Sequence, residues 1–166
     1  MRVLLIALAT VAFPAGATAQ DPMVEAVVTD QLQAIATVQS FFDAMAASNV
    51  EQSRRLLLPQ GRFVSVREEK GQPIVRSMSV EDYLATLATD KRRRRERMWH
   101  YEMRVHGRIA VVWTPYDFWI DGKFSHCGVD VFDLVKAEDG WKIAGATYTI
   151  ESTGCPPSPL GSLKQP

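Results

Sequence analysis

The chain has 166 residues, of which 46% are hydrophobic and 23% charged, so it is long enough for one domain with a sizeable core. The 19 basic residues balance the 19 acidic ones, so no global field draws the protein to nucleic acid or anionic lipid. Composition therefore excludes a disordered chain and a general polyanion binder, and we expect no nucleic-acid partner.

Residues 1–19 differ in kind from the rest of the chain. Arg2 precedes an apolar run from Val3 to Phe13, and Ala17 and Ala19 frame a small-x-small cleavage site. The alternative is a membrane anchor, but the run is shorter than the roughly 20 residues that a spanning helix needs. We expect a signal peptide cleaved after Ala19, a periplasmic or secreted mature protein, and no membrane attachment after cleavage.

Apolar residues then recur at spacings of three and four, which predicts one long helix with a single apolar stripe. The stripe consists of Val24, Val28, Leu32, Ile35, Val38, Phe42 and Met45. Asn49 and Gln52 resemble a capping box for a short second helix through Leu58, which Pro59 and Gly61 would close.

The next segment predicts a hairpin and a third helix. Strands at 62–67 and 73–78 flank a Lys70-Gly71 turn, and Ser79 with Asp82 would cap a helix that carries Tyr83. The basic run at 91–97 could bind a polyanion, but it has few stacking aromatics beside it. We interpret it as solvated cations that complement the C-terminus of this third helix.

From Trp99 to Thr153 the sequence predicts an antiparallel meander with strands at 99–105, 108–120, 123–136 and 141–152. Gly after His106 and after Asp121 supplies the positive φ of two-residue hairpin turns, and 137–140 forms the last turn. The fold class is therefore α+β. We expect one domain over 20–155 and a disordered Pro-rich tail over 156–166.

Strand register selects the residues that share a face. Counted from the turns, Asp117 lies opposite His126, Trp113 opposite Asp130, and Asp130 opposite Thr147. This predicts an inner face formed by Ile109, Val111, Trp113, Asp117, His126, Asp130, Phe132, Leu134, Trp141, Ile143, Thr147, Thr149 and Glu151. A bulge would exchange the faces and would bring in Thr114, Tyr116, Ser125 and Tyr148 instead.

On this face Asp130 and His126 are the candidate catalytic pair. Four residues on one strand separate them by roughly 13 Å, which suits opposite sides of a small ligand and excludes chelation of one metal by both. An aspartate desolvated beside Trp113 would have a raised pKa and could act as a base, while His126 could donate or accept a proton. The other expected pocket residues are Asp117, Thr147, Phe132 and His100.

A purely structural role for the same residues is the alternative. Asp130 would then bond Thr147 or His100, and His126 would pair with Asp117 or Glu151, as buried polar groups usually do. No phosphate loop, nucleophile elbow, HExxH or CxxC occurs, so we expect neither a cofactor nor a metal.

Two cysteines in an exported chain more often pair than stay free. We expect a Cys127–Cys155 disulfide that ties the end of the last strand to the sheet. The alternative is a buried free Cys127 with Cys155 exposed.

The order of elements resembles the nuclear-transport-factor-2-like (NTF2-like) superfamily, and in particular exported bacterial members of the SnoaL-like and lumazine-binding type. The resemblance covers about 32–155, and the segments that carry it are 110–118, 121–130, 132–136, 140–143 and 154–155. It implies a cone-shaped fold with a long N-terminal helix and two shorter helices on a curved, mostly antiparallel sheet. Superfamily enzymes such as ketosteroid isomerases and scytalone dehydratase place an acid or base in the cone. The isomerases' tyrosine on the first helix is not matched, because Phe41 and Phe42 stand there.

Three functions follow as expectations. The first is an exported protein that binds a small apolar molecule in its pocket. The second is a cofactor-free lyase or isomerase of the SnoaL-like or dehydratase-like kind, with Asp130 as base and His126 as acid or orienting group. The third is an interaction module that forms a homodimer through an exposed sheet face carrying Tyr116, Phe118 and Tyr148.

Overall fold

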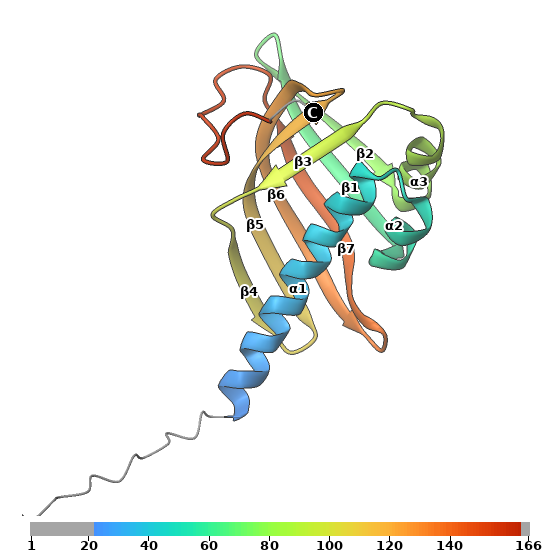
Figure 1. Cartoon of the computed structure of the whole chain (residues 1–166), viewed down its shortest axis with the longest axis vertical. Helices are drawn as coiled ribbons and strands as arrows, with labels where there is room; N and C mark the ends of the chain where they lie inside the picture. The colour runs from blue at the N-terminus through green and yellow to red at the C-terminus, as the bar shows by residue number, and fades with distance from the viewer. Residues whose placement is uncertain (1–21, 164–166) are drawn as a thin grey trace, which may run out of the picture.

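The computed structural model describes residues 22–163, so the expected signal peptide and its cleavage site lie outside the described residues. Within this range the chain forms three helices on one curved sheet of seven strands (Figure 1). The elements are α1 (Pro22–Ala46), α2 (Val50–Leu56), β1 (Leu57–Glu69), β2 (Gln72–Ser79), α3 (Val80–Thr89), β3 (Arg94–Met98), β4 (Glu102–His106), β5 (Ile109–Ile120), β6 (Lys123–Ala137) and β7 (Gly140–Ile150). The α+β class and the cone fold with its long first helix are confirmed.

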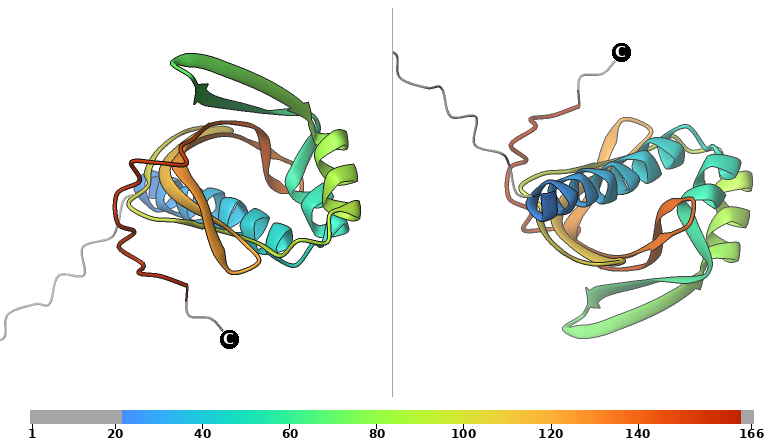
Figure 2. Two further views of the ribbon diagram at one scale, coloured as in Figure 1. Left: turned by 90° about the horizontal axis from the view of Figure 1, so that it is seen from above. Right: turned by 90° about the horizontal axis from the view of Figure 1, so that it is seen from below.

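The sheet runs in the order β2-β1-β7-β6-β5-β3, and β4 also pairs with β5. Only the β1–β7 pairing is parallel among the described strands. Seen along the long axis, the sheet wraps around α1, and the β1–β2 hairpin projects away from it (Figure 2). The cone therefore has a wall of β-strands with α1 lying inside its curvature.

The apolar stripe of α1 packs only along its second half. Ala34, Val38 and Phe42 are fully or almost fully buried in the core, whereas Val24 and Leu32 are exposed. The first part of α1 extends past the end of the sheet (Figure 1), so it has no strand to pack against. No helix in residues 22–163 is both long and apolar enough to cross a membrane.

Both predicted helix caps form. The side chain of Asn49 accepts a hydrogen bond from the amide of Gln52, and that of Ser79 accepts one from Asp82. However, α2 ends at Leu56 and β1 begins at once. Pro59 and Gly61 therefore lie within β1, where its register against β7 shifts between Leu57 and Arg62. They were wrongly predicted to close the helix.

A β-bulge changes the register between β5 and β6. The Asp121-Gly122 turn pairs Ile120 with Lys123 as predicted, but Ser125 has no partner on β5, so Phe118 pairs with His126. A one-residue bulge moves all later side chains of the partner to the other face. The inward side chains of β5 are thus Ala110, Val112, Thr114, Tyr116 and Phe118. Those wrongly predicted to face inward are Ile109, Val111, Trp113 and Asp117.

A second bulge acts on β7. Ala144 has no partner on β6, so Asp130 pairs with Tyr148 and not with Thr147. Trp141 and Ile143, which precede the bulge, face the core as predicted. Beyond it the inward residues are Ala146, Tyr148 and Ile150. The prediction of Thr147, Thr149 and Glu151 on the inner face is wrong for the same reason.

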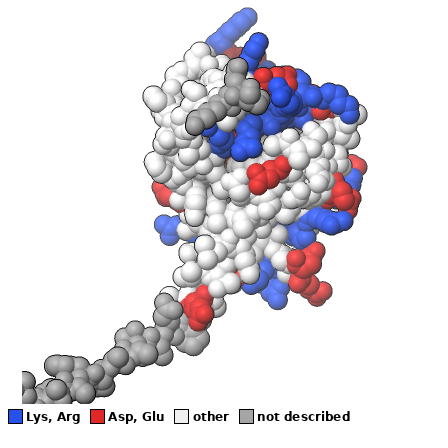
Figure 3. All heavy atoms as spheres, viewed as in Figure 1, with Lys and Arg blue, Asp and Glu red and all other residues white. Residues whose placement is uncertain are grey.

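The basic run does not simply extend beyond α3. Its second half is strand β3, which pairs with β5 and alternates between the two faces of the sheet. Lys91, Arg92, Arg93 and Arg95 are exposed, as the interpretation of a solvated run requires. Arg94 and Glu96 instead line a cavity inside the cone, and Arg97 pairs with Asp117 on the opposite face. Figure 3 shows the basic side chains gathered over this part of the molecule, with acidic ones among them.

Candidate functional site

A cavity of about 220 Å³ lies inside the cone, between α1, α3 and the inner face of the sheet. Its apolar wall is formed by Phe41, Met45, Phe63, Met78, Leu87, Phe118, Phe132, Ala146 and Ile150. Its polar lining is formed by Tyr83, Thr86, Arg94, Glu96, Tyr116, His126, Asp130 and Tyr148. The exposed side chains of Met78 and Thr86 mark the side on which the cavity reaches the surface.

Two carboxyl groups meet inside this cavity. Asp130 from β6 is 2% exposed, and Glu96 comes from β3, which lies on the far side of β5. Burial raises the pKa of Asp130 to about 7 and raises the pKa of Glu96 well above its ordinary value. A side-chain hydrogen bond joins the two groups, so they share a proton and titrate as a pair. No N–H or hydroxyl group of the described residues donates to Oδ2 of Asp130.

Tyr116 is fixed beside the carboxyl pair. Its side chain is 1% exposed, and its hydroxyl donates to the carbonyl of Thr149 at 2.6 Å. A Cβ on Gly128 would lie 2.8 Å from Cε1 of Tyr116 and would also meet the carbonyl of Thr149. Glycine at 128 therefore allows the ring to lie flat against the backbone of β6. Burial is the largest cause of the raised pKa of Tyr116, followed by the charges of Glu96 and Asp130.

His126 lies at the same end of the cavity. Its ring stacks on Phe118 with centroids 4.8 Å apart and meets Tyr116 edge-on at 5.7 Å. Nδ1 lies 3.0 Å from Oγ of Ser125, the bulge residue. Burial lowers the pKa of His126, so the ring is neutral at physiological pH and can accept or donate one hydrogen bond.

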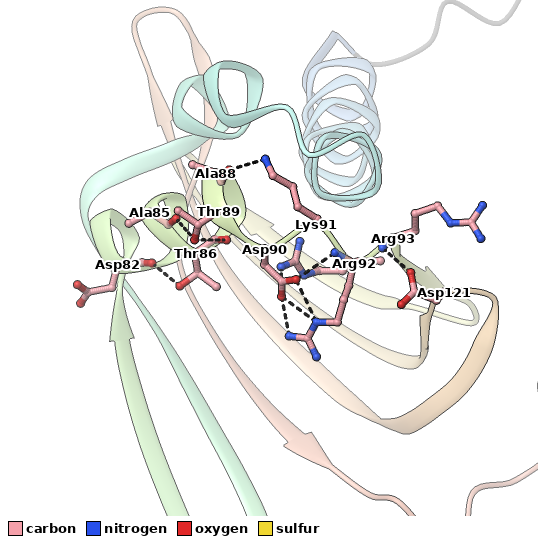
Figure 4. A network of polar contacts seen from close by, with 11 residues as sticks. Asp82, Ala85, Thr86, Ala88, Thr89, Asp90, Lys91, Arg92, Arg93 and Asp121 are labelled. Carbon is pink, nitrogen blue, oxygen red and sulfur yellow. Dashed lines mark hydrogen bonds and ion pairs between the residues drawn. The ribbon is translucent and has the colours of Figure 1, made fainter.

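Arg94 is the basic side chain in the lining of the cavity, and Asp90 already holds it. Nη2 of Arg94 lies 2.5 Å from Oδ2 of Asp90, the residue that follows α3. Figure 4 shows how the neighbouring chain is fastened: Arg92 also bonds Asp90, Lys91 reaches back to the carbonyl of Ala88, and the amide of Arg93 donates to Asp121. One carboxylate therefore faces two guanidinium groups, and Nη1 and Nη2 of Arg94 are buried without an aligned hydrogen bond, so positive charge also lies on this side of the cavity.

The predicted site residues separate into two groups. His126, Asp130 and Phe132 line the cavity together. Four others do not, namely Trp113, Asp117, Thr147 and His100. Trp113 is 50% exposed on the outer face, and Thr147 points the same way because of the bulge at Ala144. His100 lies exposed between β3 and β4 with a φ of 47°. Their predicted place in the pocket is wrong.

Asp117 instead anchors the outer face. Nε of Arg97 lies 2.8 Å from Oδ1 and Nη2 lies 2.5 Å from Oδ2, a bidentate pair whose side chains are 11% and 3% exposed. The Arg97 guanidinium also lies over the ring of Trp119 and donates to the carbonyl of Gly161. The suggested pairing of His126 with Asp117 or Glu151 is not present, because the pairing register places Cys127 opposite both residues.

The C-terminal segment covers this outer face. The predicted disulfide between Cys127 and Cys155 is present, with Cα atoms 5.9 Å apart. Residues 156–163 form neither helix nor strand, and they pass over Trp99, Trp119 and the Arg97–Asp117 pair. The expectation of a disordered tail over 156–166 stays a prediction.

Sequence reasoning missed Glu96, Arg94, Tyr116 and Tyr148 as lining residues. Glu96 carried a usable signal, because it is the one acid in a run of five arginines and stands between Arg95 and Arg97 in strand-like alternation. The tyrosines were named only as the outcome of a changed register. Within residues 22–163 no group of three or more His, Cys, Asp or Glu side chains is placed to hold a metal ion.

The family model described as "Putative lumazine-binding" matches residues 29–149, which is most of the chain. The chain belongs to this family. A comparison with curated proteins finds no match. The predicted place in the NTF2-like superfamily is confirmed, because solved structures of that superfamily share the fold of this lumazine-binding-family chain.

Three such structures define the likeness. An NTF2-like protein with a cystatin-like fold from Novosphingobium aromaticivorans is 10% identical, with a TM-score of 0.63 over 82% of this chain and 93% of its own. A "putative dehydratase from the NTF2-like family" from Streptomyces avermitilis is 17% identical, with a TM-score of 0.59 over 75% and 97%. The beta subunit of a "putative aromatic-ring-hydroxylating dioxygenase" from Novosphingobium aromaticivorans is 12% identical, with a TM-score of 0.62 over 83% and 97%. At these identities the likeness shows the fold alone.

Proposed function

We propose that the protein binds a small, largely apolar molecule in the cone. The observation that carries this proposal is the cavity itself, which combines an apolar and aromatic wall with a few convergent polar groups. Its volume of about 220 Å³ is below the roughly 300–1,000 Å³ typical of drug-sized ligand sites, so the ligand is small or extends through the mouth. The family description names lumazine, a planar bicyclic compound with N–H donors, which makes lumazine the first probe to use.

Binding is tested by titrating lumazine and small neutral aromatic compounds into the mature protein while thermal stability and heat of binding are measured. Met78→Trp should narrow the mouth and weaken binding, because Met78 lines the cavity and is 38% exposed. Val75→Trp is the matched control, since Val75 lies three residues away on the same strand, is 63% exposed and does not line the cavity. Equal binding by both variants, or no binding by the wild-type protein, would contradict the proposal.

Acid–base catalysis is a second candidate, and the raised pKa of Asp130 favours it. A carboxylate with a pKa of about 7 can accept a proton from a substrate at neutral pH without a cofactor. His126 would serve as the acid or orienting group of a lyase or isomerase. The test is turnover of substrates with an acidic C–H bond: Asp130→Asn should abolish turnover and retain the fold, and an unchanged rate would remove the assignment.

We also propose that the protein is exported and that its leader is cleaved after Ala19. The charged and apolar pattern of residues 1–19 supports this, as does a disulfide, which persists in oxidising compartments. Mass spectrometry of the protein from a periplasmic or culture fraction would give the mature N-terminus. A full-length mass with Met1 retained would contradict cleavage.

Self-association is the third candidate, through a surface different from the predicted one. Tyr116, Phe118 and Tyr148 line the cavity, so they cannot form the contact as expected. The exposed apolar side chains of the outer face are instead Ile109, Val111 and Trp113. Light scattering tests this idea: Trp113→Ser should convert a dimer to a monomer, and a wild-type monomer would exclude it.

A further inference from the structure

The carboxyl pair in the cavity has no cation of its own among the described residues. The basic groups nearest to it are engaged elsewhere: Arg94 with Asp90, and Arg97 with Asp117 on the opposite face of the sheet. Buried carboxylates are normally paired or fully hydrogen-bonded, because desolvation of an unpaired charge is costly. Oδ2 of Asp130 is buried, and the Glu96 carboxyl is the one donor that the described residues supply to the Asp130 carboxyl.

The surroundings of this pair attract positive charge. Aromatic rings line the cavity from α1, α3 and four strands, and the faces of such rings attract cations. The charged groups that act on Tyr116, beside the pair, are all acidic: Glu96, Asp130 and Glu151. Asp117 also acts on Glu96 from across the sheet. These acidic groups make the potential beside Tyr116 negative, whereas the positive charge of Arg94 acts at Tyr83 on the α3 side of the cavity.

We propose that the ligand of the cavity is a small amine, whose ammonium group is held by Glu96 and Asp130 and whose apolar body packs against the aromatic wall. This inference rests on the proposed binding function and adds the charge of the ligand to it. An ammonium has several N–H donors, so it can donate to both carboxyl groups at once. A ligand with only acceptor oxygens supplies no donor to either carboxyl group.

Binding of an ammonium must change the protonation of the pair. In the free protein burial raises the pKa of both carboxyl groups, that of Asp130 to about 7, and so favours their protonated forms. An ammonium favours both carboxylates in their ionised form, so its binding releases protons to solvent. Affinity for an amine should therefore rise with pH. The other ionisable groups facing the pair are Tyr83, Arg94, Tyr116, His126 and Tyr148. Tyr83, Tyr116 and Tyr148 have raised pKa values and His126 a lowered one, so none of these four gains or loses charge in this range.

The test is calorimetry on the mature protein with three probes of one shape: benzylamine, benzyl alcohol and benzoate. We expect benzylamine to bind at least about tenfold more tightly than benzyl alcohol at about pH 8, and benzoate to bind weakest. The affinity for benzylamine should fall by up to about tenfold per pH unit below about pH 7, with proton release that appears as a buffer-dependent heat. Benzyl alcohol should show neither effect.

Two variants and a control test whether the preference for benzylamine depends on the carboxyl pair. Asp130→Asn and Glu96→Gln should each lower the ratio of benzylamine to benzyl alcohol affinity by about tenfold or more. Asp133→Asn should leave this ratio unchanged, because Asp133 lies on the same strand with its side chain exposed on the outer face. Circular dichroism of each variant checks its fold, and the pH dependence of the wild-type protein needs no variant.

The outcomes separate this inference from the proposed function. Benzyl alcohol binding as tightly as benzylamine, or benzylamine binding without proton release, overturns the amine and leaves the binding cavity in place. Binding of none of the three probes, and of no lumazine, overturns both.

Discussion

Glu96 and Arg97 are neighbours on β3, yet they belong to opposite faces of the sheet and to opposite kinds of electrostatic arrangement. Glu96 points into the cone and meets Asp130, an acid facing an acid, and neither forms an ion pair with a described basic side chain. Arg97 points outward and forms a bidentate pair with Asp117 under the C-terminal segment. In the outer pair each charge has a partner of opposite sign, so this pair stabilises the fold. In the inner pair burial raises the pKa of both carboxyl groups, which is typical of functional sites.

Breaking the outer pair should have the largest effect. Asp117→Ala leaves the guanidinium of Arg97 buried without a carboxylate, and we expect unfolding in urea to show a loss of about 3–5 kcal/mol. Removing both partners with Arg97→Met and Asp117→Leu should recover most of this loss, because no uncompensated charge is left behind. A loss below about 1 kcal/mol in the single variant would mean that the pair behaves as a solvent-exposed one.

Releasing the C-terminal segment should come next. Cys127 and Cys155 are 28 residues apart in sequence, and replacing both with Ala removes the constraint that this loop places on the unfolded chain. We expect a loss of about 2–4 kcal/mol in the free energy of unfolding. Adding a reductant to the wild-type protein should reproduce most of the effect, whereas the double variant should not respond to it. An equal response of both proteins would show that the disulfide contributes nothing.

Removing the buried Asp130 carboxyl of the inner pair should raise the free energy of unfolding, whereas the two changes above lower it. Burial raises the pKa of Asp130 to about 7 in the folded chain, above its value in the unfolded chain. The stability that this shift contributes is present at acid pH and is lost as the pH rises through about 7. Asn cannot ionise, so Asp130→Asn should be more stable than wild type by roughly 2 kcal/mol at about pH 8, a difference that vanishes near pH 4.

Urea unfolding at several pH values measures this difference, with Asp133→Asn as the control for loss of a negative charge. The control should show no such pH-dependent gain, because Asp133 is exposed. A variant of Asp130 that is less stable than wild type at about pH 8 would show that its carboxylate is paired after all.

The sequence predicted most of the fold because its signals are local. The apolar spacing of α1, the caps at Asn49 and Ser79, and the Asp121-Gly122 turn each depend on a few neighbouring residues. These signals also place His126, Asp130 and Phe132 on one face of β6, which is correct because they lie on a single strand.

The rest of the site depends on pairing between strands, and this is where prediction failed. Ser125 and Ala144 each insert one residue, which no turn signal reveals, and each reverses the faces of a whole strand end. Composition also gave no sign that β3 is a strand, because a run of arginines is typical of a solvated segment. Burial of Arg94 and Glu96 arises only when β5 supplies an open edge for the run to pair with.

The smallest effect should come from breaking the pair between Arg92 and Asp90, an arginine–aspartate ion pair like that of Arg97 and Asp117. Arg92 bonds both oxygens of Asp90, as Arg97 bonds those of Asp117, but its side chain is 59% exposed. Figure 4 shows this pair beside the end of α3. Water solvates the Arg92 guanidinium in the folded and unfolded chain alike, and Asp90 keeps its pair with Arg94, so Arg92→Gln should leave the melting temperature unchanged at physiological salt. Arg97→Gln, the matched substitution five residues away, should lower it clearly. Similar shifts for the two variants would mean that bidentate geometry, and not burial, makes the outer pair strong.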